Sequence, residues 1–180
     1  MNIATIAGSL RKASINRGLL NACRDVAPDG VTFETLSIGV LPHYDGDLAA
    51  DGDPATVAEF KAAIASADAL LIATPEYNYS VPGVLKNALD WASRPAYRSV
   101  FAGKKTAMLG ASYSVVGTAR AQAHLKGIML GMAAPVFPYP EVLVGAAKEK
   151  FDAAGTLTDT GTREHLAAFV AAFASWVRTP

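Results

Sequence analysis

The sequence predicts an α/β fold, in which a parallel β-sheet is covered on both faces by helices. Short apolar runs that could be buried completely alternate with longer segments whose apolar residues recur at helical spacing. Wholly apolar runs are typical of parallel strands, which are buried on both faces. The 180 residues contain no internal repeat, low-complexity segment or interdomain linker, so residues 1–180 are expected to form a single domain.

The amino-terminal segments are expected to form a strand, a helix and a second strand. Every residue from Ile3 to Ala7 can be buried, as in a strand that is covered on both faces. The next segment carries one apolar helical face, which is formed by Ile15, Leu19, Leu20, Cys23 and Val26. Pro28-Asp29-Gly30 ends this helix, and residues 31–36 form the second predicted strand.

The third strand is predicted over residues 69–72, between two helices. Residues 39–54 before it contain two prolines and three glycines and are expected to be a long turn-rich segment, followed by a helix over residues 56–67. Pro75 ends the strand because it has no N–H to donate to a β-ladder. Pro82 suits the first turn of the next helix, whose apolar face contains Leu85, Ala88, Leu89 and Ala92.

The carboxyl-terminal half is expected to complete the alternation. After a connecting loop at 94–103, the pattern predicts a strand at 105–110 and a helix from about 118 to 130. Two further strand candidates lie at 135–137 and 142–144, and a polar surface loop is expected at 148–161. The apolar face of the final helix contains Leu166, Phe169, Val170, Phe173, Trp176 and Val177. Five strand–helix units with right-handed crossovers suit a flavodoxin-like three-layer sandwich with the strand order 2-1-3-4-5.

The composition argues against several classes of partner. Sixteen basic and sixteen acidic residues give a formal net charge of +0, so no basic field for nucleic acid or an anionic membrane is implied. The first residues do not resemble a signal peptide, and no apolar stretch approaches the roughly 20 residues that span a bilayer. The single cysteine, Cys23, excludes an intrachain disulfide. We therefore expect a cytoplasmic protein without nucleic-acid or membrane partners.

The loop after the first strand, residues 8–16, is a candidate phosphate site. Ser9, Ser14 and Asn16 are short hydrogen-bonding side chains, and Arg11 supplies a fixed positive fork. The loop leads into a helix N-terminus, where free N–H groups and the helix dipole favour an anion. It contains neither a P-loop motif nor G-x-G-x-x-G. An ordinary turn with a Ser or Asn cap would look the same, so the residues alone leave both interpretations open.

Two further loops follow strand ends and would flank the same crevice. In the loop after the third strand, Tyr77 and Tyr79 offer flat apolar faces, and Asn78 and loop amides offer donors for a heterocycle. The alternative is a rigid turn, pinned by prolines, whose tyrosines cover the helix. The loop from Ser112 to Gly117 follows the fourth strand, and its glycine permits close approach of a ligand or of another backbone. It can equally be a simple connection.

No other residue predicts chemistry by a side chain. Cys23 lies on an apolar helix face, where a buried, inert thiol is expected. His43, His124 and His165 lack metal-ligand spacing, so no metal site is expected. The absence of G-x-S-x-G argues against a hydrolase serine. Two roles are open for Glu76, pairing with a neighbouring cation or acting as an acid, and we favour a structural or recognition role because no proton-transfer step is demanded of it.

Two motifs resemble those of the NAD(P)H-dependent FMN reductase family, and in particular its bacterial chromate and quinone reductases. They read Gly8-Ser9-Leu10-Arg11-x-x-Ser14-x-Asn16 and Pro75-Glu76-Tyr77-Asn78-Tyr79-Ser80-Val81-Pro82-Gly83-x-Leu85-Lys86-Asn87-Ala88-x-Asp90-Trp91. The resemblance continues through residues 117–125 and the last helix. It implies non-covalently bound FMN with its phosphate at Ser9, Arg11, Ser14, Ile15 and Asn16. The ring and ribityl chain would lie against Pro75, Glu76, Tyr77, Asn78, Tyr79, Ser112 and Gly117.

The resemblance also implies an activity. The protein would be an FMN-dependent NAD(P)H oxidoreductase that passes a hydride from nicotinamide through flavin N5 to quinones, chromate or azo compounds by a ping-pong mechanism. No catalytic side chain would be required, because the flavin carries the chemistry. Two alternatives remain open: a flavodoxin-like electron carrier, which the net charge of +0 disfavours because flavodoxins tend to be strongly acidic, and a reductase that supplies free reduced FMN to a monooxygenase.

The resemblance further implies homodimers or homotetramers, with FMN near the subunit interface. In the chromate-reductase branch an Arg-Tyr-Glu network helps join dimers into tetramers. Arg120 and Glu141 match two members of this network, but Ala123 stands where the tyrosine is expected. Tyr113 departs from the small residues usual in its loop, and we expect it to narrow the mouth of the pocket or cover the flavin.

Overall fold

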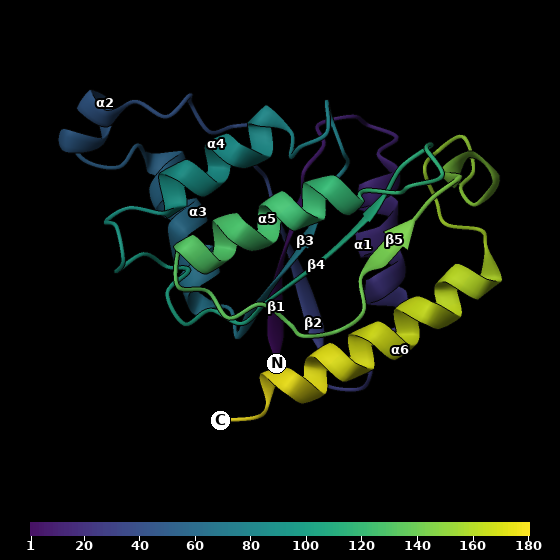
Figure 1. The fold of residues 1–180 in the computed structure, drawn as a ribbon. Helices are drawn as coiled ribbons and strands as arrows, with labels where there is room; N and C mark the ends of the chain where they lie inside the picture. The colour runs from purple at the N-terminus through teal and green to yellow at the C-terminus, as the bar shows by residue number, and fades with distance from the viewer.

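The computed structural model describes residues 1–180 and contains one five-stranded parallel sheet (Figure 1). The strands lie in the order β2-β1-β3-β4-β5, and every neighbouring pair is parallel. This arrangement confirms the predicted fold class and strand order. The strands are β1 (Asn2–Ala7), β2 (Thr32–Leu36), β3 (Ala69–Ala73), β4 (Thr106–Ala111) and β5 (Val142–Val144).

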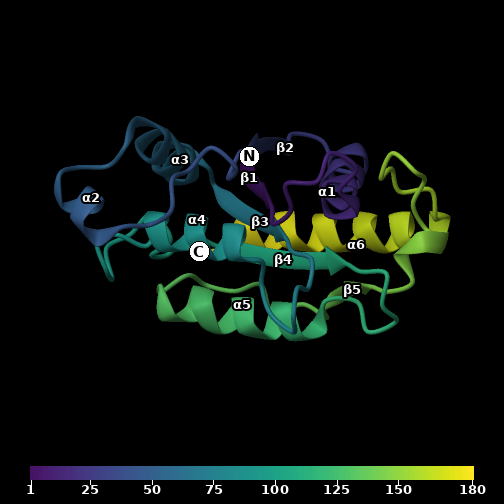
Figure 2. The same cartoon turned by 90° about the horizontal axis from the view of Figure 1, so that it is seen from above.

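Helices cover both faces of the sheet, and Figure 2 shows β4 between α5 and α6. The helices are α1 (Ile15–Asp25), α2 (Gly46–Ala50), α3 (Ala55–Ser66), α4 (Gly83–Ala92), α5 (Ala119–Gly131), α6 (Thr160–Val177) and the short 3₁₀ helix η1 (Ala147–Glu149). The core on one face packs against α1 and α6, and the core on the other face packs against α3, α4 and α5. No helix is both long and apolar enough to cross a bilayer.

The central strand β3 shows why its sequence is wholly apolar. All five of its residues are fully buried. Leu71 points into the core beneath α1 and α6, whereas Leu70 and Ile72 point into the core beneath α3, α4 and α5. Because successive side chains of a strand point to opposite faces, a strand with two covered faces needs apolar residues at every position.

Three sequence expectations need correction. The turn-rich segment 39–54 contains the short helix α2, which has no buried residue and therefore no apolar stripe to reveal it; Asp45 caps it by accepting from the Asp47 N–H at 2.9 Å. Residues 135–137 do not form a strand, because only Val136 makes an isolated bridge, to Thr106. Pro82 lies at the N-cap of α4, one residue before the first turn.

The expected surface loop 148–161 is partly a core segment. Its two large apolar residues, Phe151 and Leu157, form an isolated antiparallel bridge and pack into the core beneath α1 and α6. The last helix begins within this segment, at Thr160. Because the segment is mostly polar, its composition did not indicate that Phe151 and Leu157 are buried. Their burial holds the segment against α1.

Cys23 is completely buried in the core between the sheet and α1, and burial raises the pKa of its thiol to about 12. Because the thiolate is the reactive form, we expect no reaction of the folded protein with a thiol reagent such as dithionitrobenzoate at pH 8. One thiol per chain should react after unfolding in guanidinium. Rapid labelling of the folded protein, at the rate of free cysteine, would contradict the inert role.

Candidate functional site

A cavity of about 150 Å³ lies where β1, β3 and β4 end, and it is lined by Ser9, Arg11, Ser14, Ile15, Asn16, Pro75, Glu76, Tyr77, Ala111, Ser112 and Tyr113. Three loops that are far apart in the sequence therefore meet at one site, as the topology of a parallel sheet predicts. Among the predicted site residues, Asn78, Tyr79 and Gly117 are not in this lining. Ala111 is the residue that the sequence did not suggest, because an alanine at the end of a buried strand carries no chemical signal.

The first loop presents backbone donors and a free cation. Ser14 is the N-cap of α1, and its Oγ accepts from the Arg17 N–H at 3.3 Å. The N–H groups of Ile15 and Asn16 at the start of the helix have no acceptor within the chain. The guanidinium of Arg11 is exposed and takes part in no ion pair. Free N–H groups, a helix N-terminus and an unpaired arginine together suit an anionic group.

The Asn16 side chain has a different task from the one expected. Its Nδ2 donates to the Ala111 carbonyl at 3.0 Å, and its Oδ1 accepts from the Ala111 N–H at 2.9 Å. Both polar ends are thus committed to the last residue of β4, and the side chain is almost completely buried. Asn16 therefore fixes the first loop to the fourth strand. A contact between this residue and a phosphate stays a prediction, and it would have to come from the backbone N–H.

The second loop is a tight hairpin turn. Tyr77 and Ser80 exchange two backbone hydrogen bonds of 3.0 Å, and the two residues between them, Asn78 and Tyr79, have φ of 50° and 68°. Positive φ at both central residues is the signature of a two-residue turn of the primed type. A bulky residue such as Tyr79 rarely adopts this conformation, so its surroundings must hold it there.

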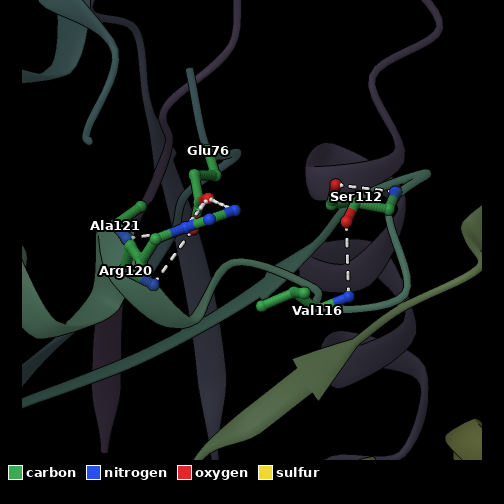
Figure 3. A network of polar contacts seen from close by, with 6 residues as sticks. Glu76, Ser112, Val116, Arg120 and Ala121 are labelled. Atoms are coloured by element: carbon green, nitrogen blue, oxygen red, sulfur yellow. Dashed lines mark hydrogen bonds and ion pairs between the residues drawn. The ribbon is translucent and has the colours of Figure 1, made fainter. Parts of the chain in front are cut away.

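The carboxylate of Glu76 supplies that support, as Figure 3 shows. Its Oε2 accepts from the N–H groups of Arg120 and Ala121 at 3.0 and 3.2 Å, and its Oε1 pairs with the Arg120 guanidinium. The ring of Tyr79 stacks on the same guanidinium, with its centroid 3.9 Å from Cζ. Glu76 thus caps α5 and ties the hairpin to that helix. Of the two roles open for Glu76, the structure shows the pairing with a cation.

The pKa of Glu76 follows from these contacts. Burial alone would raise it, but the side-chain hydrogen bond from Arg120, the Ala121 N–H, the charge of Arg120 and the Arg120 N–H together hold it below its ordinary value. The carboxylate is therefore ionised at neutral pH and fully occupied by donors. It has no free proton to transfer to a ligand in the cavity.

The third loop forms the opposite wall of the cavity. Ser112 Oγ accepts from the Ser114 N–H at 3.1 Å, and Ser114 Oγ accepts from the Val116 N–H at 3.3 Å (Figure 3). Gly117 has φ of 68°, and a Cβ at this position would lie 3.2 Å from Leu143 atoms, so the glycine permits close approach to β5 instead of to the cavity. Tyr113 lines the cavity and is 55% exposed, which places it at the mouth.

The residues that match the intersubunit network have partners within the chain. Arg120 pairs with Glu76, and Glu141 pairs with Lys126 at 2.5 Å. The structure therefore does not bring Arg120 and Glu141 into one ion pair. The homodimer and homotetramer stay predictions.

The site combines an anion-binding end with aromatic and apolar walls. No cluster of His, Cys, Asp and Glu side chains has the arrangement of a metal site. The donor set of the first loop suits a phosphate, and Tyr77, Pro75 and Tyr113 suit a flat ring. This set of groups fits FMN.

Comparison with known proteins agrees with this fit. Residues 1–149 match the family model described as NADPH-dependent FMN reductase. The chain is 44% identical over 178 residues to a 2-hydroxy-1,4-benzoquinone reductase from Burkholderia sp, with 99% of this chain and 97% of that protein covered. It is equally 44% identical over 178 residues to an NAD(P)H-dependent FMN reductase from Pseudomonas aeruginosa, with 99% and 96% covered.

A solved structure extends the similarity to three dimensions. The flavoenzyme NAD(P)H:(acceptor) oxidoreductase FerB from Paracoccus denitrificans is 41% identical and superposes with a TM-score of 0.88, with 98% of this chain and 96% of that chain covered. Sequence, fold and the cavity at the strand ends lead to one conclusion: the chain belongs to the NADPH-dependent FMN reductase family.

Proposed function

We propose that this protein uses bound FMN to take electrons from NAD(P)H and to pass them to quinones. One observation carries the proposal: a single cavity joins the unpaired Arg11 and the free N–H groups of Ile15 and Asn16 to the ring-sized surfaces of Tyr77 and Tyr113. The names of the relatives, which include a benzoquinone reductase, support quinones as the acceptor class. Chromate and azo compounds are proposed as further acceptors, because the cavity opens to solvent beside the exposed Tyr113.

The residues have distinct roles in this proposal. Arg11 and the backbone of Ile15 and Asn16 would hold the FMN phosphate, while Ser9 and Ser14 fix the shape of the loop through the Arg11 and Arg17 N–H groups. When bound, FMN supplies the hydride and electron transfer. Of the remaining predicted residues, Pro75, Glu76, Tyr77 and Ser112 would line the ring and ribityl region. Asn78, Tyr79 and Gly117 lie outside the lining and would shape the loops around it. Glu76 would act there through the hairpin that it anchors to α5.

The absorption spectrum of the purified protein tests the proposal. We expect flavin bands that survive long dialysis, bleach on anaerobic addition of NADPH or NADH and return on addition of a benzoquinone. Parallel double-reciprocal plots for donor and acceptor would support the ping-pong order. Loss of the flavin on dialysis would favour a supplier of free reduced FMN, and slow bleaching by both nicotinamides would favour an electron carrier. A colourless protein that takes up no FMN would overturn the proposal.

Arg11→Ala is expected to raise the dissociation constant for FMN about 10- to 100-fold. The reason is the loss of charge-assisted hydrogen bonds, which are worth about 1.5–3 kcal/mol each. Quenching of flavin fluorescence on titration into the apoprotein measures the change. Lys12→Ala is the matched control, because Lys12 is the adjacent cation and lies outside the cavity lining. Equal affinity of the Arg11 variant and the parent would contradict the phosphate assignment.

A further inference from the structure

A second cavity, of about 280 Å³, adjoins the proposed flavin site, and it is lined by Arg11, Ala13, Ile15, Tyr113, Ala147, Lys148, Phe151, Asp152 and Ala153. Arg11, Ile15 and Tyr113 line the first cavity as well. These three side chains therefore form a wall that the two cavities share. Together the cavities reach the size of roughly 300–1,000 Å³ that is usual for small-molecule sites.

Two cations and one carboxylate line the second cavity. Arg11 and Lys148 are exposed, and no ion pair within the chain includes either side chain. The one carboxylate in the lining, Asp152, has its Oδ1 occupied by the N–H groups of Ala154 and Thr156, at 2.9 and 2.8 Å. Arg11 is assigned to the FMN phosphate, so Lys148 is the cation that stays free in this cavity when FMN is bound, and a free cation favours an anionic ligand such as a phosphate ester.

The remaining lining suits a flat group. Ala13, Ala147 and Ala153 are small, and Tyr113 presents a ring that is 55% exposed. Aromatic side chains stack on nucleobases because every base has a π-face. A cavity with small walls, one exposed aromatic ring and a free lysine therefore matches the parts of an adenine nucleotide.

We propose that the second cavity binds the adenosine phosphate end of the NAD(P)H co-substrate. The inference rests on the proposed function, which puts the nicotinamide end at the flavin in the first cavity. The pyrophosphate joins the two ends of the dinucleotide, so the remainder must leave the first cavity over one of its walls. The wall at Arg11 and Tyr113 leads directly into the second cavity. Lys148 is then a binding residue for the co-substrate and not for FMN.

A neighbouring groove is less suitable for this ligand. It contains Lys12, Arg17 and Arg163, but its volume is only about 100 Å³ and it shares Ser14 alone with the first cavity. Arg163 is also paired with Asp25 at 3.5 Å, which reduces the free charge. The shared wall and the larger volume favour the cavity beside Lys148.

Calorimetric titration of the FMN-loaded protein with 5′-ADP and with 2′,5′-ADP tests the site without turnover. Lys148→Ala is expected to raise the dissociation constant about tenfold, the effect of one solvent-accessible charge-assisted hydrogen bond. Lys150→Ala is the matched control, because Lys150 lines a different groove beside β5 and should leave ADP binding unchanged. A larger loss for 2′,5′-ADP than for 5′-ADP would place the 2′-phosphate at Lys148, and equal losses would place the pyrophosphate there.

Two results would overturn the inference. One is equal binding of both ADP compounds by the Lys148 variant and the parent, or no binding by the parent. The other is loss of FMN from the Lys148 variant, which would assign the cavity to the flavin.

Steady-state kinetics separates a failure of this inference from a failure of the proposed function. The ratio of kcat/KM for NADPH to that for reduced nicotinamide mononucleotide, which lacks the adenosine, is expected to fall about tenfold in Lys148→Ala, through KM. An unchanged ratio in an active enzyme would reject the second cavity alone. A parent protein that oxidises neither donor would reject the proposed function.

Discussion

Glu76→Gln is expected to lower the free energy of unfolding by about 2–4 kcal/mol. The side chain of Glu76 is 6% exposed, and its two oxygens accept from two backbone N–H groups and the Arg120 guanidinium. Glutamine keeps the shape but brings an amide NH₂ towards groups that are themselves donors. Removing one partner of a buried ion pair lowers the free energy of unfolding by about 3–5 kcal/mol. The expected value is smaller because Arg120 is 41% exposed and water can solvate it again.

Urea unfolding, followed by circular dichroism, measures this difference. Glu141→Gln is the matched control, because Glu141 also pairs with a cation but both partners are more than a third exposed, at 39% for Glu141 and 35% for Lys126. An exposed pair contributes about 0–1 kcal/mol, so the control should be nearly as stable as the parent. Similar stability changes in the two variants would show that Glu76 is not the link between the hairpin and α5.

The effect of Glu76→Gln should also depend on pH. The pKa of Glu76 in the folded protein lies below its ordinary value of 4.5, so the folded state favours the ionised form. The stability that the carboxylate contributes is therefore fully present above pH 4.5 and is lost as the pH falls through the folded-state pKa. The difference between parent and variant in urea unfolding should accordingly shrink in acid. A difference that stayed constant below that pH would contradict the ionic origin.

Glu76 also illustrates how far the sequence reaches. Its position after a buried strand predicted that it lies beside the site, and its charge left two roles open, pairing with a cation or acting as an acid. The identity of that partner did not follow, because Arg120 is 44 residues away and the same charge could have paired with several cations. Asn16 is a similar case: its side chain is committed to Ala111, 95 residues away, and alanine carries no signal for such a contact.

The fold was more predictable than these contacts because the burial of an element determines the spacing of apolar residues in its sequence. β3 is apolar at every position because both of its faces are covered. The helix α2 was not predicted because none of its residues is buried, so its sequence has no apolar stripe. Phe151 and Leu157 were hidden because two apolar residues in a polar segment do not show which core they enter.

Gly18→Ala is expected to lower the free energy of unfolding by about 2 kcal/mol, although alanine is the better helix former. In a helix interior alanine is favoured over glycine by about 1 kcal/mol. At Gly18, however, an added Cβ would lie 1.9 Å from the carbonyl oxygen of Gly155 and 3.3 Å from Phe151. Because the nearest atom belongs to the backbone, either α1 or the 152–157 segment must move. Such overpacking removes about 1–3 kcal/mol, occasionally more, and outweighs the propensity.

Gly127→Ala is the matched control for the sign of this change in the free energy of unfolding. Gly127 lies inside α5, and a Cβ there meets nothing within 4 Å. The variant should therefore gain about 1 kcal/mol from helix propensity alone. Opposite shifts of the urea midpoint in the two variants would establish the close contact between α1 and Gly155. Stabilisation by both substitutions would show that the contact is absent.

The Gly18 substitution should also reach the flavin site, because one helix connects the two. Gly18 lies one turn after Ser14, whose Oγ caps α1, and its N–H donates to the Ser14 carbonyl at 2.9 Å. A shift of this turn would displace the free N–H groups of Ile15 and Asn16 that are proposed to hold the phosphate. We therefore expect weaker FMN binding in Gly18→Ala at temperatures where the variant remains folded, and unchanged FMN binding in Gly127→Ala. Fluorescence titration of both apoproteins distinguishes a moved phosphate site from a general loss of stability, because only the first changes the affinity of the folded state.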